Sequence, residues 1–169
     1  MKHPLIRRLG AKPSHKDGFS GSSPTIMPSA SAIREGIAVR KALSDMRVLV
    51  VDDNPDNAML SQIYLRKSVK SADTAETASS AIAKIGEAAK NGKYDLVLCD
   101  IMLDNGRTGF DVEKEAKALS PGTIFVFVTG HDRGGFAKNF SGQEYPDLVL
   151  QKPIKKDALL EFLGKLCDS

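Results

Sequence analysis

Five short apolar runs alternate with helical segments between Met46 and the C-terminus, and this alternation constrains the fold more than any other feature. The runs are dominated by Val, Ile, Leu and Phe, which is typical of strands buried on both faces of a sheet. The second run is shorter and half polar. We expect strands over residues 47–51, 69–73, 94–99, 123–128 and 147–150. A repeated strand–helix pattern predicts a parallel sheet with helices on both faces, a doubly wound α/β fold.

The segments between these runs carry helix signals. Asn54 followed by Pro55 suits the N-cap and first position of a helix. A helix over 109–119 should direct Phe110, Val112, Ala116 and Leu119 inward. Residues 131–145 are rich in glycine, so any helix there should be short. The longer helices are expected over 55–65, 77–90, 109–119 and 156–166.

Charge is distributed unevenly along the 169 residues, which suffice for one ordinary domain and a tail. Residues 1–45 hold eight Lys/Arg and three Asp/Glu, a net +5, while the remaining sixteen and eighteen give −2, which together make the overall +3. The folded part is therefore not basic, which argues against a uniformly basic nucleic-acid-binding domain.

Targeting signals and metal-binding cysteine clusters are absent from the sequence. No apolar run approaches the roughly 18 residues of a membrane span, and the N-terminus lacks the apolar core of a signal peptide. Cys99 and Cys167 lie far apart, and no Cys/His group has zinc spacing. This cysteine usage fits a reducing compartment, so we expect a cytoplasmic protein.

Residues 1–45 are expected to form a basic, mostly disordered tail, because their Pro, Gly and Ser content buries too little apolar surface. Apolar residues between Ile33 and Leu43 suggest a short helix within 31–45, although Gly36 disfavours it by about 1 kcal/mol. Three roles stay open: a linker from a larger architecture, a docking or dimerising segment, or contact with nucleic acid or membrane. The scattered basic residues, with no aromatic residues between them, make the nucleic-acid case weak.

Chemically useful side chains stand at the ends of four of the predicted strands. Asp52 and Asp53 end the first, Asp100 the third, Thr129 the fourth and Lys152 the fifth. Any one of them could be an ordinary loop start. In open parallel sheets, however, ligands bind beyond the carboxyl ends of the strands. Three carboxylates, a hydroxyl and an ammonium at one edge therefore predict a functional site.

Four motifs surround these residues: VVDDN at 50–54, LCDIML at 98–103, FVTG at 127–130 and QKP at 151–153. Over residues 46–169 the chain resembles the receiver domain of two-component response regulators. The stretches SPGTIFVFVTG and LQKP are most similar to receivers attached to hybrid histidine kinases, and a stand-alone receiver fits equally well. The resemblance implies a flavodoxin-like, five-stranded parallel sheet of strand order 2-1-3-4-5.

The resemblance also implies roles for individual residues. Asp100 would be the phosphoacceptor, receiving phosphate from a histidine kinase or histidine phosphotransfer protein. Mg²⁺ would be held by Asp52, Asp53, Asp100 and the backbone carbonyl of Met102. Thr129 and Lys152 would contact phosphoryl oxygens. The peptide bond after Lys152 would be cis.

A receiver of this kind is not an enzyme toward other substrates and supports only its own Mg²⁺-dependent phosphoryl transfer and autodephosphorylation. Since residues 46–169 leave no room after them for a DNA-binding or catalytic domain, output is expected through an unidentified protein partner or onward phosphotransfer.

The chain departs from the family pattern at several positions. Asp104 stands where proline is common, in a loop that is longer than usual. Val149 stands where a switch aromatic is expected, so ordering of residues 130–145 on phosphorylation is an alternative switch. His131 is either a loop residue or one that gates water. Cys99, beside Asp100, is expected in the core.

Two other functions compete with the phosphoacceptor. The first is a phosphorylation-independent scaffold with the receiver fold. The second is an aspartate-nucleophile phosphatase, which needs two aspartates flanking one residue on the first strand, whereas Asp52 and Asp53 are adjacent.

Overall fold

The computed structural model describes residues 41–103 and 106–167. Its centre is a five-stranded parallel sheet of order β2-β1-β3-β4-β5, which confirms the predicted flavodoxin-like α/β fold. The strands are β1 (Arg47–Val51), β2 (Ser71–Ala75), β3 (Leu96–Asp100), β4 (Ile124–Thr129) and β5 (Val149–Gln151). The helices are η1, a 3-10 turn (Leu43–Asp45), α2 (Pro55–Leu65), α3 (Ala78–Asn91), α4 (Gly109–Leu119), α5 (Arg133–Asn139) and α6 (Lys156–Cys167).

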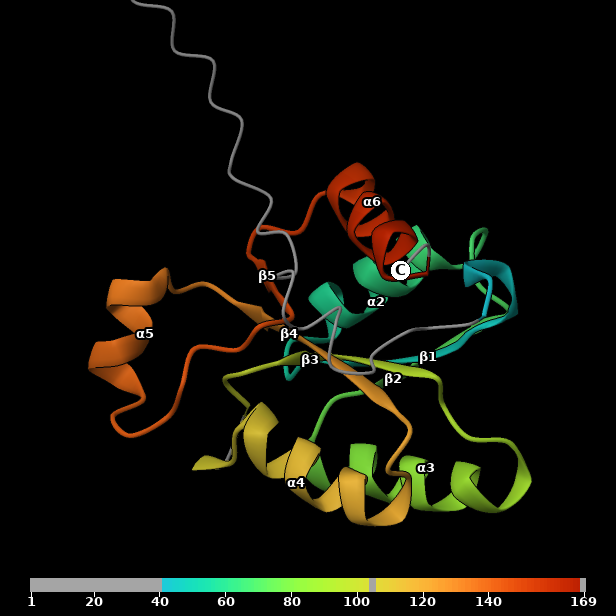
Figure 1. Ribbon diagram of the computed structural model, residues 1–169, viewed down its shortest axis with the longest axis horizontal. Coiled ribbons are helices and arrows are strands. Elements are labelled where there is room, and N and C mark those ends of the chain that lie inside the picture. Colours follow the sequence, from blue (N-terminus) through green and yellow to red (C-terminus); the bar gives the residue numbers. More distant parts are fainter. Residues whose placement is uncertain (1–40, 104–105, 168–169) are drawn as a thin grey trace, which may run out of the picture.

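The sheet separates two helical layers. Helices α2 and α6 cover one face and α3 and α4 cover the other, whereas α5 stands beyond the carboxyl ends of the strands (Figure 1). Alternate side chains of β4 point to opposite faces of the sheet. Val126 packs with the α2/α6 layer, and Phe127 packs with the α3/α4 layer. This explains why β1, β3 and β4 are almost continuously apolar, since both faces of each strand are buried.

Side-chain caps fix where the helices begin. The Asn54 side chain accepts hydrogen bonds from the backbone N–H groups of Asp56 and Asn57, with Pro55 in the first helical position, as predicted. Thr108 and Asp111 form a reciprocal capping box at the start of α4. Such caps satisfy backbone donors that have no partner within the helix, so the strand-to-helix turns next to the carboxyl edge are well defined.

Several predicted boundaries differ from those observed. The second strand begins at Ser71 rather than at 69, and the fifth covers only Val149–Gln151. Both are edge strands with a single ladder, where local composition specifies pairing least. Leu119, predicted to point inward, is 46% exposed at the end of α4. Helix α5, only seven residues long, agrees with the short helix expected in 131–145.

The predicted tail falls almost entirely outside the described residues. Residues 1–40, including most of the helix suggested within 31–45, are not described, and only the 3-10 turn Leu43–Asp45 is seen from that segment. Within residues 41–103 and 106–167, no helix has both the length and the apolar character needed to cross a bilayer.

Candidate functional site

The carboxyl edge of the sheet brings three carboxylates together. Asp52 and Asp53 directly follow β1, and Asp100 is the last residue of the neighbouring strand β3. One carboxylate oxygen from each of the three lies within 4.8 Å of the other two. Asp52 and Asp100 are buried and Asp53 is half-buried. The predicted acidic residues therefore meet in space.

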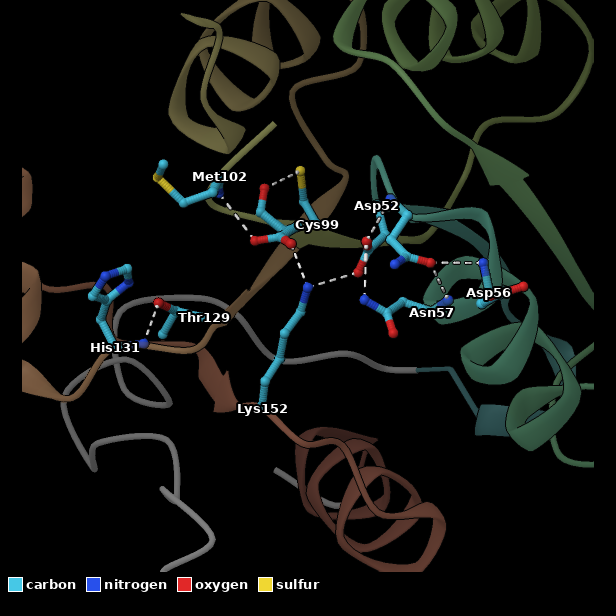
Figure 2. A network of polar contacts seen from close by, with 10 residues as sticks. Asp52, Asp56, Asn57, Cys99, Met102, Thr129, His131 and Lys152 are labelled. Carbon is cyan, nitrogen blue, oxygen red and sulfur yellow. Dashed lines mark hydrogen bonds and ion pairs between the residues drawn. The ribbon is translucent and has the colours of Figure 1, made fainter. Parts of the chain in front are cut away.

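Lys152 joins this group from the end of the edge strand β5, at the same carboxyl edge of the sheet. Its Nζ donates to Asp52 Oδ2 at 2.9 Å and also contacts Asp100 Oδ2, as Figure 2 shows for the labelled Lys152 and Asp52. Its backbone N–H donates to the carbonyl of Thr129 at 2.7 Å, which holds the start of the loop after β5 against β4. The Lys152–Pro153 peptide bond is cis, as the resemblance implied.

Burial and ion pairing act on the charges of this group. The Lys152 ammonium contacts two of the three carboxylates, those of Asp52 and Asp100. Burial raises the pKa of Asp100, outweighing the opposing effects of Lys152 and of the hydrogen bond from Met102. Burial would lower the pKa of Lys152, but its hydrogen bonds to Asp100 and Asp52 prevail and raise that pKa. Lys152 is therefore held as a cation between the two buried carboxylates.

Backbone and amide donors orient the carboxylates. The Oδ1 atom of Asp52 accepts from the backbone N–H of Asn54 at 3.0 Å and from Nδ2 of Asn57 at 3.4 Å. The Oδ1 atom of Asp100 accepts from the backbone N–H of Met102 at 3.0 Å. Asn57 was not singled out from the sequence. Its place in the first turn of α2, three residues after the N-cap Asn54, is the signal that could have found it.

Thr129 and His131 lie at the opposite side of Lys152 from Asp52 (Figure 2). The hydroxyl oxygen of Thr129, which is buried, accepts a hydrogen bond from the backbone N–H of His131 at 3.0 Å. The His131 ring packs edge-on against Phe140, just after α5, and its Nδ1 atom is buried without a hydrogen-bond partner. The end of β4 is therefore coupled to the start of the segment that carries α5.

Gly109, the first residue of α4, lies against the backbone of the phosphoacceptor candidate. A Cβ at this position would lie 2.5 Å from the carbonyl oxygen of Asp100 and 3.1 Å from Sγ of Cys99. The Gly109 N–H also donates to the carbonyl of Ile101 at 2.9 Å. Only glycine permits this approach, and nothing in the local sequence pattern identified it.

Two further predictions concern residues next to the site. Cys99 is fully buried in the α3/α4 layer, as expected, and burial raises the pKa of its thiol well above the ordinary range. Val149 is likewise fully buried at the start of β5. Valine offers no ring that could reorient, and the switch through residues 130–145 stays a prediction.

The donor set fits a hard divalent cation. Asp52, Asp53 and Asp100 provide only carboxylate oxygen atoms, the ligands that Mg²⁺ prefers. The carbonyl of Met102 as a fourth ligand stays a prediction. A cleft of about 360 Å³ opens beside Asp52 and Lys152 and runs along α2 past Leu60 and Tyr64.

Comparison with known proteins places this geometry in a family. Residues 48–163 match the model of the response regulator receiver domain. The aerobic respiration control sensor protein ArcB of Escherichia coli K12 is 31% identical over 131 residues, which cover 75% of this chain but only 16% of that protein. The chain thus spans about a sixth of this relative's length.

Solved structures agree with the sequence comparison. A CheY-like receiver domain protein from Methanospirillum hungatei is 26% identical, with a TM-score of 0.58, covering 74% of this chain and 95% of that one. The receiver domain of the hybrid histidine kinase CckA shares the fold at 22% identity, with a TM-score of 0.56, covering 72% and 98% of the two chains. The chain belongs to the family of response regulator receiver domains.

Proposed function

We propose that this chain is the phosphoacceptor of a two-component phosphorelay and that Asp100 receives the phosphoryl group. The observation that carries the proposal is the meeting of three carboxylates and the Lys152 ammonium at one edge of the sheet. Receivers do not act as catalysts on other substrates, so the site acts on its own aspartate. The functional unit corresponds to residues 46–169.

The proposed chemistry follows from where charge develops. Attack by a carboxylate oxygen of Asp100 on the phosphorus of a phosphohistidine forms the new P–O bond as the P–N bond breaks, and the imidazole leaves. Mg²⁺ bound by Asp52, Asp53 and Asp100 would neutralise phosphoryl oxygens. Lys152 stabilises another oxygen after exchanging its contact with Asp100 for one with the phosphoryl group. The Thr129 hydroxyl donates a hydrogen bond to a third phosphoryl oxygen.

The surface beside the site is suited to docking a protein donor. The cleft next to Asp52 is lined on one side by Leu60 of α2, and Met59, Leu60 and Ile63 are each about half exposed. Three large apolar side chains exposed on one helix are more than scattered surface residues require. We propose that a histidine kinase or histidine phosphotransfer protein contacts α2 while its phosphohistidine reaches Asp100.

The proposed output runs through β4 and α5. When Thr129 turns toward the phosphoryl group, its hydrogen bond with the backbone N–H of His131 is lost, so the start of the α5 segment can rearrange and become ordered around the new position of Thr129. Because Val149 cannot act as an aromatic switch, ordering of residues 130–145 is the proposed response. Amide hydrogen exchange over these residues should change when the site is loaded with beryllofluoride and Mg²⁺, and identical exchange would refute this switch.

Acetyl phosphate or beryllofluoride with Mg²⁺ tests the phosphoacceptor directly. With acetyl phosphate, the wild-type chain should gain one phosphoryl group in mass spectrometry, only when Mg²⁺ is present, and Asp100→Asn should gain none. With beryllofluoride, the amide spectrum of the wild type should change in the same Mg²⁺-dependent way, and that of Asp100→Asn should not. Asp157→Asn, a matched change at an exposed aspartate in the first turn of α6, should behave as wild type.

The remaining outcomes identify the alternatives. A correctly folded wild-type chain that forms no adduct would support a phosphorylation-independent scaffold. Rapid turnover of several phosphoesters, abolished by Asp100→Asn, would support a phosphatase.

A further inference from the structure

Strand β2 is an outer strand of the sheet and pairs, among the described strands, with β1 alone. An outer strand presents backbone N–H and C=O groups along its free side, and a strand of another chain can pair with them. The fate of these groups on β2 therefore decides whether this edge of the domain can join to another protein chain.

The residues of β2 alternate between the two sides of the strand. In a parallel ladder a residue directs its N–H and its C=O to the same side, and the next residue directs both to the other side. The N–H of Ser71 and the carbonyl of Ala75 form hydrogen bonds with the residues that flank β1, at 3.4 and 3.2 Å. Asp73 lies midway between them and faces β1 as well. Ala72 and Thr74 therefore face the free side.

Side chains from two helices occupy both of these outward carbonyls. Gln62 of α2 donates from Nε2 to the carbonyl of Ala72 at 2.6 Å. Lys84 of α3 donates from Nζ to the carbonyl of Thr74, also at 2.6 Å. Because α2 and α3 lie on opposite faces of the sheet (Figure 1), the two donors reach one edge from its two sides. A second strand would have to displace both donors before it could pair with β2.

The residue between these two carbonyls opposes the simplest pairing by its charge. Two antiparallel copies of β2, related by a two-fold axis at Asp73, would place Ala72 of one copy opposite Thr74 of the other. Each such pair could exchange both of its backbone hydrogen bonds. In that register, however, the two Asp73 carboxylates stand directly opposite each other, where like charges destabilise pairing. The Tyr94 hydroxyl fixes the carboxylate by donating to Asp73 Oδ2 at 2.8 Å.

We propose that Gln62, Asp73 and Lys84 together keep the free edge of β2 from pairing with β2 of a second copy of this chain. Gln62 and Lys84 occupy the carbonyls that the second copy would need, and Asp73 repels its counterpart. Gln62 and Lys84 thus have a role that neither the acidic site nor the proposed docking face of α2 requires. This inference does not depend on phosphorylation of Asp100.

Sedimentation of the full-length chain over a range of concentrations tests the proposal. The test variant combines Gln62→Met and Lys84→Met, which keep much of the side-chain length but remove the donors, with Asp73→Asn, which removes the charge but retains an acceptor for Tyr94. This triple variant should self-associate about tenfold more tightly than the wild type, or more. Circular dichroism at low concentration checks that it is folded.

A matched control carries the same three chemical changes at exposed positions away from β2: Gln143→Met, Lys90→Met and Asp157→Asn. It should associate no more tightly than the wild type. Amide hydrogen exchange locates the contact. In the triple variant the amides of Ala72 and Thr74 should exchange more slowly at high than at low protein concentration, whereas in the wild type their exchange should not depend on concentration.

Three outcomes would overturn the proposal. The first is a folded triple variant that associates no more tightly than the wild type, and the second is equal association of the matched control. The third is concentration-dependent protection of Ala72 and Thr74 in the wild type, which would mean that the edge pairs in spite of the three side chains.

Should the triple variant fail to fold, the double variant Gln62→Met and Lys84→Met gives the same comparison. It retains the Asp73 carboxylate and its hydrogen bond with Tyr94. Because salt screens the repulsion between the two carboxylates, this double variant should associate more tightly at high salt than at low salt, and more tightly than the wild type at high salt. Association equal to that of the wild type at high salt would overturn the proposal.

Discussion

Replacing Gly109 by alanine should destabilise the domain and disturb the phosphoacceptor at the same time. The new Cβ would lie 2.5 Å from the carbonyl oxygen of Asp100, whereas real Cβ contacts essentially never fall below 3.0 Å. The backbone of either α4 or β3 must therefore move by at least 0.5 Å, and neither contacting atom is the end of a flexible side chain. Overpacking of this kind costs about 1–3 kcal/mol, which lowers the ratio of folded to unfolded chains by about 5- to 150-fold.

The matched control is Gly164→Ala in the interior of α6, where a Cβ would meet nothing within 4 Å. There the same chemical change should stabilise the protein by about 1 kcal/mol, because alanine loses less backbone entropy than glycine on forming a helix. Since the chain contains no tryptophan, urea unfolding is followed by far-ultraviolet circular dichroism, with the midpoint compared at constant m value.

A second measurement connects the change to function. Displacement of the Asp100 backbone should weaken Mg²⁺-dependent beryllofluoride binding in Gly109→Ala, while Gly164→Ala binds as wild type. If both substitutions shift the unfolding midpoint in the same direction and leave beryllofluoride binding unchanged, the close approach of α4 to Asp100 is not a constraint and the reasoning is refuted.

Three further perturbations follow from the contacts described above. Hydrogen bonds from the backbone and side chain of Thr108 lower the pKa of Asp111 below its ordinary 3.8. The stabilisation of the folded state by the ionised Asp111 carboxylate is therefore fully present above pH 3.8 and disappears as the pH falls through the pKa of the folded state. Asp111→Asn should accordingly lower the free energy of unfolding by about 0.5 kcal/mol at pH 7. In urea titrations at the acid end of the pH series, the two proteins should be equally stable. A difference that does not change with pH would contradict this. Lys152→Met removes the ammonium that forms ion pairs with Asp52 and Asp100. Mg²⁺ should therefore bind more tightly to this variant in isothermal titration calorimetry. Weaker binding would show that Lys152 does not compete with the metal. Ile63→Lys on the exposed face of α2 should change the free energy of unfolding by no more than about 0.5 kcal/mol. It should slow phosphotransfer from the purified histidine kinase that phosphorylates the wild type fastest, but leave the rate of phosphorylation by acetyl phosphate unchanged. Equal slowing with both phosphate donors would argue against docking of the kinase on α2.

The alternation of apolar runs with helical segments was sufficient to predict the parallel sheet, because strand and helix periodicities are local properties of the chain. The acidic site followed from the same information. Once the strands are parallel, their carboxyl ends share one edge. The strand order 2-1-3-4-5 that the family resemblance implied makes the first and third strands neighbours, so Asp52 and Asp100 were expected to approach each other. Boundaries were less predictable where pairing is weakest, as at β2 and β5.

Other features depend on distances between segments far apart in sequence. The contact of Lys152 with Asp52 joins residues one hundred positions apart, and the Gly109 approach to Asp100 depends on how closely α4 packs against β3. The contacts of Phe136 with Phe140 and Tyr145 likewise join α5 to residues that follow it in the chain. By itself, the sequence determined which side chains reach the edge and in what order. Only tertiary packing decided their separations and the pairing of Lys152 with Asp52 and Asp100, because these depend on how whole helices pack against the sheet rather than on any local pattern.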